Sequence, residues 1–305
     1  MTNGRRPIRH PAQPSEAHVN IRIVENGPVR LATETFGDPA HPALLLIMGA
    51  NASMLEWPEA FCEALATHGR FVIRFDHRDT GQSSQFPAGD PGYTVDDMAT
   101  DIIAILDAYG CADADMVGMS LGGYIAQMVA ERHPDRVRTL TLIASEPLGW
   151  DGADLPPISE AFLAHFGGLA SLDMADRAAV GAFLLEIARL CAGSAFSFAR
   201  DDISARIARD LGRRDGFETL FNHATLEVVS DWAGAYARIT LPTLVIHGTE
   251  DPILPFAKGM ALAGGIPGAR LEPLEGVGHE LPGPLLEPIA ALIADHVGAR
   301  SRPRP

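Results

Sequence analysis

Short runs that are rich in apolar residues recur along the chain, and most are separated by stretches with the residue spacing of a helix. The apolar runs are residues 19–24, 29–35, 43–48, 71–76, 115–119, 138–144, 242–247 and 269–274. From the third onward they are bounded by Gly, Pro or Asp, which is typical of strands buried on both faces of a parallel sheet. Helical spacing is found in residues 57–68, 94–109, 121–133 and 285–297. This alternation predicts an α/β fold with a mostly parallel central sheet and helices on both of its faces.

The alternation breaks in the middle of the chain. Residues 146–238 contain helical stretches, such as 178–191, and no clear strand run. We therefore expect a helical cap over residues 146–238, inserted in a core formed by residues 19–145 and 239–298. A chain of 305 residues that is 47% hydrophobic is long and apolar enough for one large core with such an insertion.

The charge balance argues against nucleic-acid and membrane partners, and the first residues do not resemble a secretory signal. The net charge of -15 argues against a nucleic-acid partner, because such proteins carry a basic face, and also against an anionic membrane surface. No apolar run approaches the roughly 18 residues that a membrane span needs. The Arg- and Pro-rich residues 1–18 lack the apolar stretch of a secretory signal, so they and residues 299–305 are expected to be a disordered arm and tail.

The three cysteines, Cys62, Cys111 and Cys191, are an odd number without CxxC spacing. They predict neither a disulfide framework nor a zinc site, and scattered thiols suit a reducing compartment. We therefore expect a cytoplasmic protein, as a monomer or homodimer, whose cysteines are small buried residues.

A candidate nucleophile lies in the pattern Gly118-Met-Ser120-Leu121-Gly122. An apolar run precedes it and an amphipathic helix follows it, which is the setting of a serine on a sharp strand-to-helix turn. Such a turn is strained and crowded, so it needs small neighbours, and Gly123 allows close approach of helix and sheet. The Leu121 backbone N–H would then lie at a helix N-terminus, where it can donate to a developing oxyanion. The alternative is a Gly-rich turn in which Ser120 only caps the helix.

A serine nucleophile needs a base and an orienting carboxylate, in the chain order Ser, acid, His in this architecture. His279 lies in a glycine-flanked loop just after the last apolar run. The other downstream histidines are His133, His165, His223, His247 and His296. Asp251 ends the polar loop after run 242–247 and is the favoured acid, with Glu250 and Glu146 as alternatives. We expect Ser120, Asp251 and His279 to form a triad.

The second oxyanion donor is expected in the loop after run 43–48, where Ala50 is small enough to present its N–H. Aromatic residues of the cap would line an apolar pocket, although most of them would form the core of the cap. The candidates for substrate contact are Asn51, Met119, Trp150, Phe162 and Phe166. A loop network at the edge of the sheet is expected from His77, Arg78 and Asp79. A metal site at these residues would lack a third ligand.

Five segments, LLLIMGAN, DHRDTGQS, VGMSLGG, VIHGTEDP and GVGHELP, occur in this order and together resemble the α/β-hydrolase superfamily. Two positions depart from the family pattern: Met48 precedes Gly49 where most members have His, and Asp79 stands where Gly is common. Both variants occur together in a narrower group, the aclacinomycin methylesterases. The segments IRFDHRDTGQS and PTLVIHGTEDPI also resemble this group. The resemblance implies an α/β-hydrolase fold, the same triad, and Ala50 and Leu121 as oxyanion donors.

These observations predict a carboxylic-ester hydrolase that forms an acyl-enzyme and needs no metal or organic cofactor. Its substrate would be a small-molecule ester, bulky and apolar or aromatic, like a polyketide. A lactonase, a carbon–carbon bond hydrolase, a haloperoxidase-like enzyme or a proline-type aminopeptidase could use the same triad. The aminopeptidase would need acidic cap residues, for which the candidates are Glu160, Glu186, Glu218 and Glu227. A ligand-binding module on the same fold is the non-enzymatic alternative.

Overall fold

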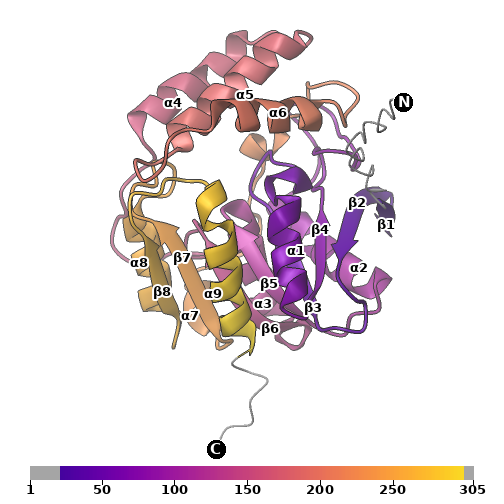
Figure 1. Cartoon of the computed structure of the whole chain (residues 1–305), viewed down its shortest axis with the longest axis vertical. Coiled ribbons are helices and arrows are strands. Elements are labelled where there is room, and N and C mark those ends of the chain that lie inside the picture. The colour runs from indigo at the N-terminus through magenta and orange to yellow at the C-terminus, as the bar shows by residue number, and fades with distance from the viewer. Residues whose placement is uncertain (1–20, 299–305) are drawn as a thin grey trace, which may run out of the picture.

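The computed structural model describes residues 21–298, and an eight-stranded sheet forms its centre (Figure 1). The strands are β1 (Arg22–Asn26), β2 (Val29–Phe36), β3 (Ala43–Ile47), β4 (Phe71–Phe75), β5 (Ala114–Met119), β6 (Val137–Ile143), β7 (Thr243–Gly248) and β8 (Arg270–Leu274). Their order is β1-β2-β4-β3-β5-β6-β7-β8, antiparallel from β1 to β4 and parallel from β4 to β8. The predicted mostly parallel sheet is confirmed.

Helices cover both faces of the sheet because successive strand residues point to opposite sides. Leu44 and Leu46 of β3 face α1 (Glu59–Thr67) and α9 (Leu286–Gly298), whereas Leu45 and Ile47 face the opposite layer. The helices of that layer are α2 (Val95–Ala108), α3 (Leu121–Arg132) and α8 (Phe256–Gly265). Single 3-10 turns are found at Met54–Glu56, Pro134–Arg136 and Gly283–Leu285.

A helical cap lies over the carboxyl ends of the parallel strands, at the top of Figure 1. We use the word cap for residues 159–225. Its elements are α4 (Glu160–Gly167), α5 (Arg177–Cys191), α6 (Arg200–Leu211) and the 3-10 turns Gly168–Ser171 and Asn222–Thr225. The cap has an apolar cluster of its own, formed by Val180, Phe183, Leu211, Phe217, Leu220 and Phe221.

Both ends of the predicted insertion, residues 146–238, pack on the core. Leu148 and Trp232 are buried in the main core cluster, together with residues of α7 (Ala235–Arg238). Tyr236 N–H also donates to the Leu148 carbonyl at 3.1 Å. Residues at both ends of the segment 146–238 thus belong to the core cluster. Helix α7 has only four residues, too few to show a periodic pattern in the sequence.

The expected arm at residues 1–18 and tail at residues 299–305 lie outside the described residues. Between residues 21 and 298, no helix is both long enough and apolar enough to cross a membrane.

Candidate active site

Ser120 occupies a strained turn between β5 and α3. Its backbone angles, φ of 53° and ψ of -121°, lie in a region that residues other than Gly rarely adopt. Such a backbone conformation costs on the order of 1–3 kcal/mol. Surrounding hydrogen bonds hold this conformation: Ser120 N–H donates to the Ile143 carbonyl at 2.9 Å. The Ser120 carbonyl accepts from Gly123 N–H at 3.0 Å and from the Ser145 hydroxyl at 2.9 Å. The sheet and α3 thus hold the backbone of the partly exposed Ser120 in this conformation.

The glycines around Ser120 are required by close backbone contacts. A Cβ on Gly118 would lie 2.4 Å from the Gly122 carbonyl oxygen. A Cβ on Gly122 would lie 2.0 Å from the carbonyl oxygen of Ile47, the last residue of β3. The helix that follows Ser120 can therefore start directly beside the end of β3.

This close approach brings the loop after β3 to the serine. A Cβ on Gly49 would lie 3.1 Å from the Ser120 Cβ and 3.7 Å from its Oγ. Ala50 follows Gly49, and Leu121 is the first residue of α3, where backbone N–H groups have no partner within the helix. Both predicted oxyanion donors are thus on segments that meet at Ser120, and this arrangement can stabilise negative charge on a carbonyl oxygen.

Asp251 and His279 follow the neighbouring parallel strands β7 and β8 and are joined by a short hydrogen bond. The distance from His279 Nδ1 to Asp251 Oδ2 is 2.7 Å. Asp251 Oδ1 accepts from the backbone N–H groups of Ile253 and Leu254, each at 2.8 Å. Since the carboxylate oxygen accepts, Nδ1 carries the proton and His279 Nε2 retains a free lone pair. The Asp251 side chain is fully buried, whereas that of His279 is 12% exposed.

Within residues 21–298 no hydrogen bond joins the Ser120 hydroxyl to the His279 ring. Both residues lie at the carboxyl ends of parallel strands, under the cap. The structure therefore brings Asp251 and His279 into contact and places Ser120 at the same edge of the sheet. Hydrogen bonds between a nucleophile and its base are often loose in ligand-free enzymes.

The two alternative acids have other partners. Glu250 accepts from Ser194 N–H at 2.8 Å and from its hydroxyl at 2.7 Å. Glu146 forms an ion pair with Lys258. Of the three carboxylates considered, only Asp251 contacts His279 in the part of the chain that the structure describes.

The cap is bonded to the loop that carries His279. His279 N–H donates to the Cys191 carbonyl at the end of α5, at 2.8 Å, and Gly193 N–H donates to Glu280 Oε1 at 2.9 Å. Burial raises the pKa of Glu280, and it raises the pKa of the Cys191 thiol to about 12. Cys191 thus keeps its proton at neutral pH and supports the histidine loop through its backbone.

Two histidines contact the loop after β3, and sequence reasoning did not assign either of them to it. His77 Nε2 donates to the Met48 carbonyl at 2.9 Å. His223, from the end of the cap, accepts from Asn51 N–H through Nδ1 at 2.9 Å. Burial lowers the pKa of His77 to about 3 and that of His223 to about 4. No local pattern indicates His223, because its contact spans 172 residues of sequence.

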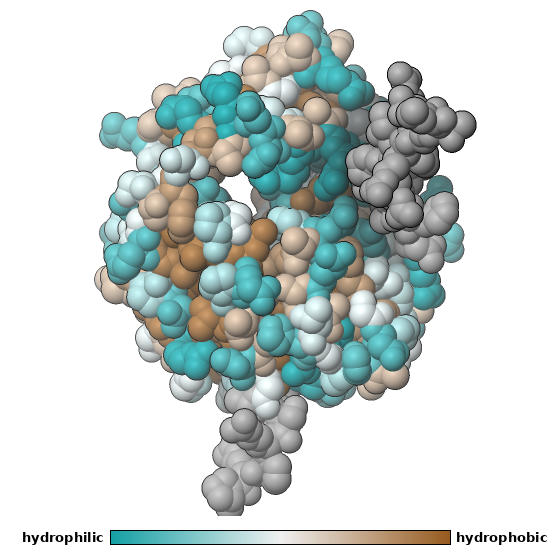
Figure 2. Space-filling view, in the orientation of Figure 1, coloured by the Kyte–Doolittle hydropathy of each residue, from teal (hydrophilic) through white to brown (hydrophobic). Residues whose placement is uncertain are grey.

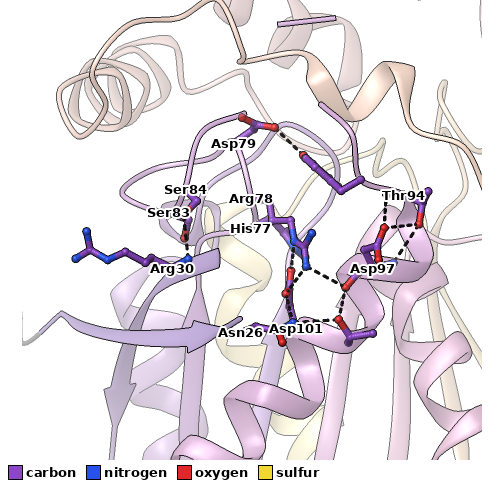
Figure 3. A network of polar contacts seen from close by, with 12 residues as sticks. Asn26, Arg30, His77, Arg78, Asp79, Ser83, Ser84, Thr94, Asp97 and Asp101 are labelled. Carbon is purple, nitrogen blue, oxygen red and sulfur yellow. Dashed lines mark hydrogen bonds and ion pairs between the residues drawn. The ribbon is translucent and has the colours of Figure 1, made fainter. Parts of the chain in front are cut away.

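The expected loop network of His77, Arg78 and Asp79 is confirmed (Figure 3). Arg78 makes a bidentate ion pair with Asp101 at 2.7 and 2.8 Å. Asp79 accepts from the Tyr93 hydroxyl at 2.8 Å and from Asn222 of the cap at 3.0 Å. In the described range 21–298, no group of three or more His, Cys, Asp or Glu is arranged to hold a metal ion.

Four of the five candidates for substrate contact lie on segments near Ser120 or in the cap. Met119 ends β5 and is buried, and Asn51 has a left-handed backbone with φ of 61°. Phe162 stacks on Phe166 with a centroid distance of 5.8 Å, and Ser159 N–H, just before them, donates to the Pro252 carbonyl. Figure 2 shows an opening between the cap and the sheet core.

Trp150 is not brought together with the other candidates. Its ring packs on Tyr236 of α7 at a centroid distance of 5.2 Å, and its indole N–H donates to the Ala153 carbonyl. Helix α7 packs against α3 and α8 of the core.

A parallel sheet with a strained serine turn, followed by an Asp–His pair on the loops after two later strands, is the architecture of a hydrolase. The family described as alpha/beta hydrolase fold matches residues 42–282, and the chain belongs to this family.

Among similar proteins, the rhodomycin D methylesterases of Streptomyces sp. and Streptomyces peucetius are 37% and 36% identical to this chain. Each comparison covers 91% of the chain and 98% of the relative. The resemblance to methylesterases is therefore confirmed, and the chain is a hydrolase of the alpha/beta hydrolase family. A 2-hydroxymuconate semialdehyde hydrolase of Pseudomonas sp. is 32% identical over 77% of the chain and 80% of the relative.

Solved structures agree with the fold. An esterase from a Rhodococcus species has a TM-score of 0.72 at 21% identity, covering 92% of this chain and 98% of that one. A meta-cleavage product hydrolase from Pseudomonas fluorescens has a TM-score of 0.73 at 19% identity, over 92% of this chain and 98% of that one.

Proposed function

We propose that the chain is a serine carboxylesterase in which Ser120, His279 and Asp251 act as nucleophile, base and orienting acid. The observation that carries this assignment is the 2.7 Å hydrogen bond between Asp251 and His279, on loops beside the strained Ser120 turn. The carboxylate fixes the His279 tautomer with its proton on Nδ1, so that Nε2 can take the proton of a serine hydroxyl.

Acylation starts when Ser120 Oγ attacks the ester carbonyl and His279 Nε2 takes the hydroxyl proton. The carbonyl oxygen becomes an oxyanion that accepts hydrogen bonds from the N–H groups of Ala50 and Leu121. The intermediate collapses, the alcohol leaves with the proton from His279, and Ser120 remains acylated. Asp251 stabilises the imidazolium while it carries the proton.

Deacylation repeats the sequence with water as the nucleophile. His279 takes a proton from water, the hydroxide adds to the acyl carbon, and the same two N–H groups hold the second oxyanion. Collapse releases the carboxylic acid and returns the proton to Ser120.

We infer that the substrate is a small-molecule methyl ester whose acid part is bulky and apolar or aromatic. The support is the 36–37% identity to rhodomycin D methylesterases over nearly their whole length. The stacked Phe162 and Phe166 at the start of the cap, together with Met119 and Asn51, are suited to contact such an acid. Carbon–carbon bond hydrolysis is the second candidate, because of the 32% identity to a 2-hydroxymuconate semialdehyde hydrolase.

The first prediction concerns the nucleophile. Replacing Ser120 by Ala removes the attacking oxygen, so we expect ester turnover to fall by roughly 10⁴-fold or more. A fluorophosphonate probe should label the native protein and not Ser120→Ala. Retention of native turnover by the variant would rule out the triad.

A substrate panel separates the candidate reactions. Methyl esters of polycyclic aromatic acids should be hydrolysed with a higher kcat/KM than p-nitrophenyl acetate, lactones and vinylogous 1,5-diketones. Preference for the diketones would replace the ester proposal by carbon–carbon bond hydrolysis.

A further inference from the structure

We propose that His223 of the cap is a positioning residue for the oxyanion loop, residues 48–51. His223 fixes the Asn51 end of this loop, while His77 fixes the Met48 end. This inference rests on the proposed function, because it assigns to Ala50 N–H the role of an oxyanion donor. It makes the cap a structural part of the catalytic site as well as its cover.

The His223 ring bridges two core loops through both of its nitrogens. Nδ1 accepts from Asn51 N–H at 2.9 Å, and Nε2 donates to the Arg78 carbonyl at 2.8 Å. The side chain is buried, so water does not compete readily for either bond. Because Asn51 directly follows Ala50, the first bond orients the peptide next to the proposed donor.

His77 holds the other end of the same loop. Its Nε2 donates to the Met48 carbonyl at 2.9 Å, and its ring lies edge-on to that of His223 with a centroid distance of 5.9 Å. The two bonds use the Met48 carbonyl and the Asn51 N–H, and they leave the Ala50 N–H between them for a ligand. The loop is thereby fixed on both sides of the group that must point at the oxyanion.

The bond from Asn51 N–H to His223 requires a neutral His223 ring. His223 Nδ1 can accept a hydrogen bond only while it carries no proton, and His77 lies in a fully buried site. Burial lowers the pKa of both residues, to about 4 for His223 and about 3 for His77, which keeps them neutral throughout the neutral pH range.

The neighbouring Asn222 gives His223 a rigid support. Its side-chain oxygen accepts from Gly89 N–H at 2.9 Å, and its amide donates to Asp79 at 3.0 Å and to the Pro87 carbonyl at 3.1 Å. Asn222 is buried as well. These bonds hold the adjacent His223 at a fixed place relative to the core loops, and His223 in turn holds Asn51.

The energetic reason for such a support is the sensitivity of oxyanion stabilisation to geometry. A donor must lie about 2.7–3.1 Å from the oxyanion, and a misplacement of about 1 Å can cost on the order of 10²-fold in rate. Asn51 has a left-handed backbone with φ of 61°, a conformation that Asn adopts more readily than most residues. The bond from Asn51 N–H to His223 restricts the loop to this conformation.

Two substitutions separate the two bonds of His223. In His223→Asn, Oδ1 lies where Nδ1 was and can still accept from Asn51 N–H. In His223→Gln, the amide NH₂ lies near the former Nε2 and can still donate to the Arg78 carbonyl, but the acceptor for Asn51 is lost. We expect His223→Gln to lower kcat about 10- to 100-fold with little change in KM. His223→Asn should retain at least about tenfold more kcat than His223→Gln.

A trifluoromethyl ketone provides a second readout, because Ser120 adds to it and forms a hemiketal oxyanion. His223→Gln should weaken its binding by about the same factor as kcat, whereas the affinity for the carboxylic acid product should stay within about threefold. His296→Gln is the matched control: His296 also donates to a buried carbonyl, that of Leu140 at 3.0 Å, but on α9. This control should leave kcat and ketone affinity at the native level.

Equal losses of kcat in His223→Asn and His223→Gln, or native kcat and ketone affinity in His223→Gln, would overturn the inference. Ser120→Ala, assayed in parallel, distinguishes this result from failure of the proposed function. If Ser120→Ala is inactive while His223→Gln is native, the triad stands and only the positioning role is lost.

Discussion

At the scale of single residues, Asp251 combines two tasks through its two oxygens. Oδ1 accepts from the backbone N–H groups of Ile253 and Leu254 and thereby orders its own loop, while Oδ2 accepts from His279. His247 lies beside them: its Nε2 is 3.5 Å from Asp251 Oδ2 and donates to the Leu254 carbonyl at 2.7 Å. The position of the acid is thus fixed before substrate binds.

Asp251→Asn tests the task of Oδ2. The amide oxygen can still accept from Ile253 and Leu254, so we expect the loop to stay folded. The amide NH₂ would face His279 and favour the tautomer that has its proton on Nε2, which cannot act as a base. We expect kcat to fall on the order of 10³- to 10⁴-fold with a Tm close to the native value.

Glu146→Gln is the control for Asp251→Asn. It removes a carboxylate that pairs with Lys258 instead of His279, so kcat should change by less than about threefold. A loss in Glu146→Gln as large as that in Asp251→Asn would contradict the assignment of the acid.

The sequence predicts the residues whose roles depend on local backbone. Gly118 and Gly122 are needed because a Cβ at either position would collide with backbone within 2.4 Å, and such glycines are visible as a motif. His223 has no such signal: its role comes from a contact with Asn51 across 172 residues. Trp150 shows the same limit, since its packing on Tyr236 follows from the path of the chain after the cap.

At the scale of elements, the parallel strands are predictable because they are buried on both faces and appear as continuous apolar runs. Each predicted end of β3 to β8 lies within one residue of the observed end. Helix α7 was not predicted, because four residues carry no periodicity and its position depends on Trp232 and Ala235 being buried in the core.

The segment after α5 and the His279 loop form one tightly packed unit, and Gly193 lies at a close contact between them. A Cβ on Gly193 would lie 2.1 Å from the Gly276 carbonyl oxygen and 2.5 Å from Gly278 N. Gly193→Ala should push the two loops apart, strain the bond from His279 N–H to Cys191, and lower kcat by about tenfold or more. Steady-state kinetics and Tm measure the effect.

Gly167→Ala is the matched glycine control in the cap. Gly167 ends α4 with a helical φ of -60°, and a Cβ there would have no atom within 4 Å. We expect native kcat and a small gain in stability, up to about 1 kcal/mol, since Ala is the better helix former. If Gly193→Ala were as active as Gly167→Ala, the cap would not support the histidine loop.

At the scale of the whole molecule, the cap is joined to the core by charged and polar groups on several sides. Arg213 pairs with the buried Asp76 at 2.6 Å, and Arg206 pairs with Glu56 at 2.9 Å. His223 and Cys191 bond the oxyanion loop and the histidine loop, respectively. Unfolding must therefore expose buried ionisable groups, and stability should depend on pH.

His223 contributes to this dependence with a definite sign. The groups that face it are the His77 ring, the Arg78 carbonyl, Asp79 and the Arg214 guanidinium. Burial lowers its folded pKa to about 4, whereas the unfolded chain takes up the proton near the ordinary value of 6.5. Between these values the unfolded state binds more protons, so stability is lost as pH falls from about 6.5 toward about 4.

The last prediction compares unfolding free energies of the native protein and His223→Asn by urea denaturation from pH 7.5 to pH 4.5. Above about pH 6.5 the two curves should run parallel. Below it the native protein should lose up to about 1.4 kcal/mol per pH unit more than the variant, because one further group titrates. Asp76 and Asp210, whose pKa values burial raises, act in the opposite direction in both proteins and cancel in the difference. Parallel curves down to pH 4.5 would mean that His223 takes up its proton in the folded state as readily as in the unfolded state. This result would contradict the bond from Asn51 N–H to His223, which requires an unprotonated Nδ1.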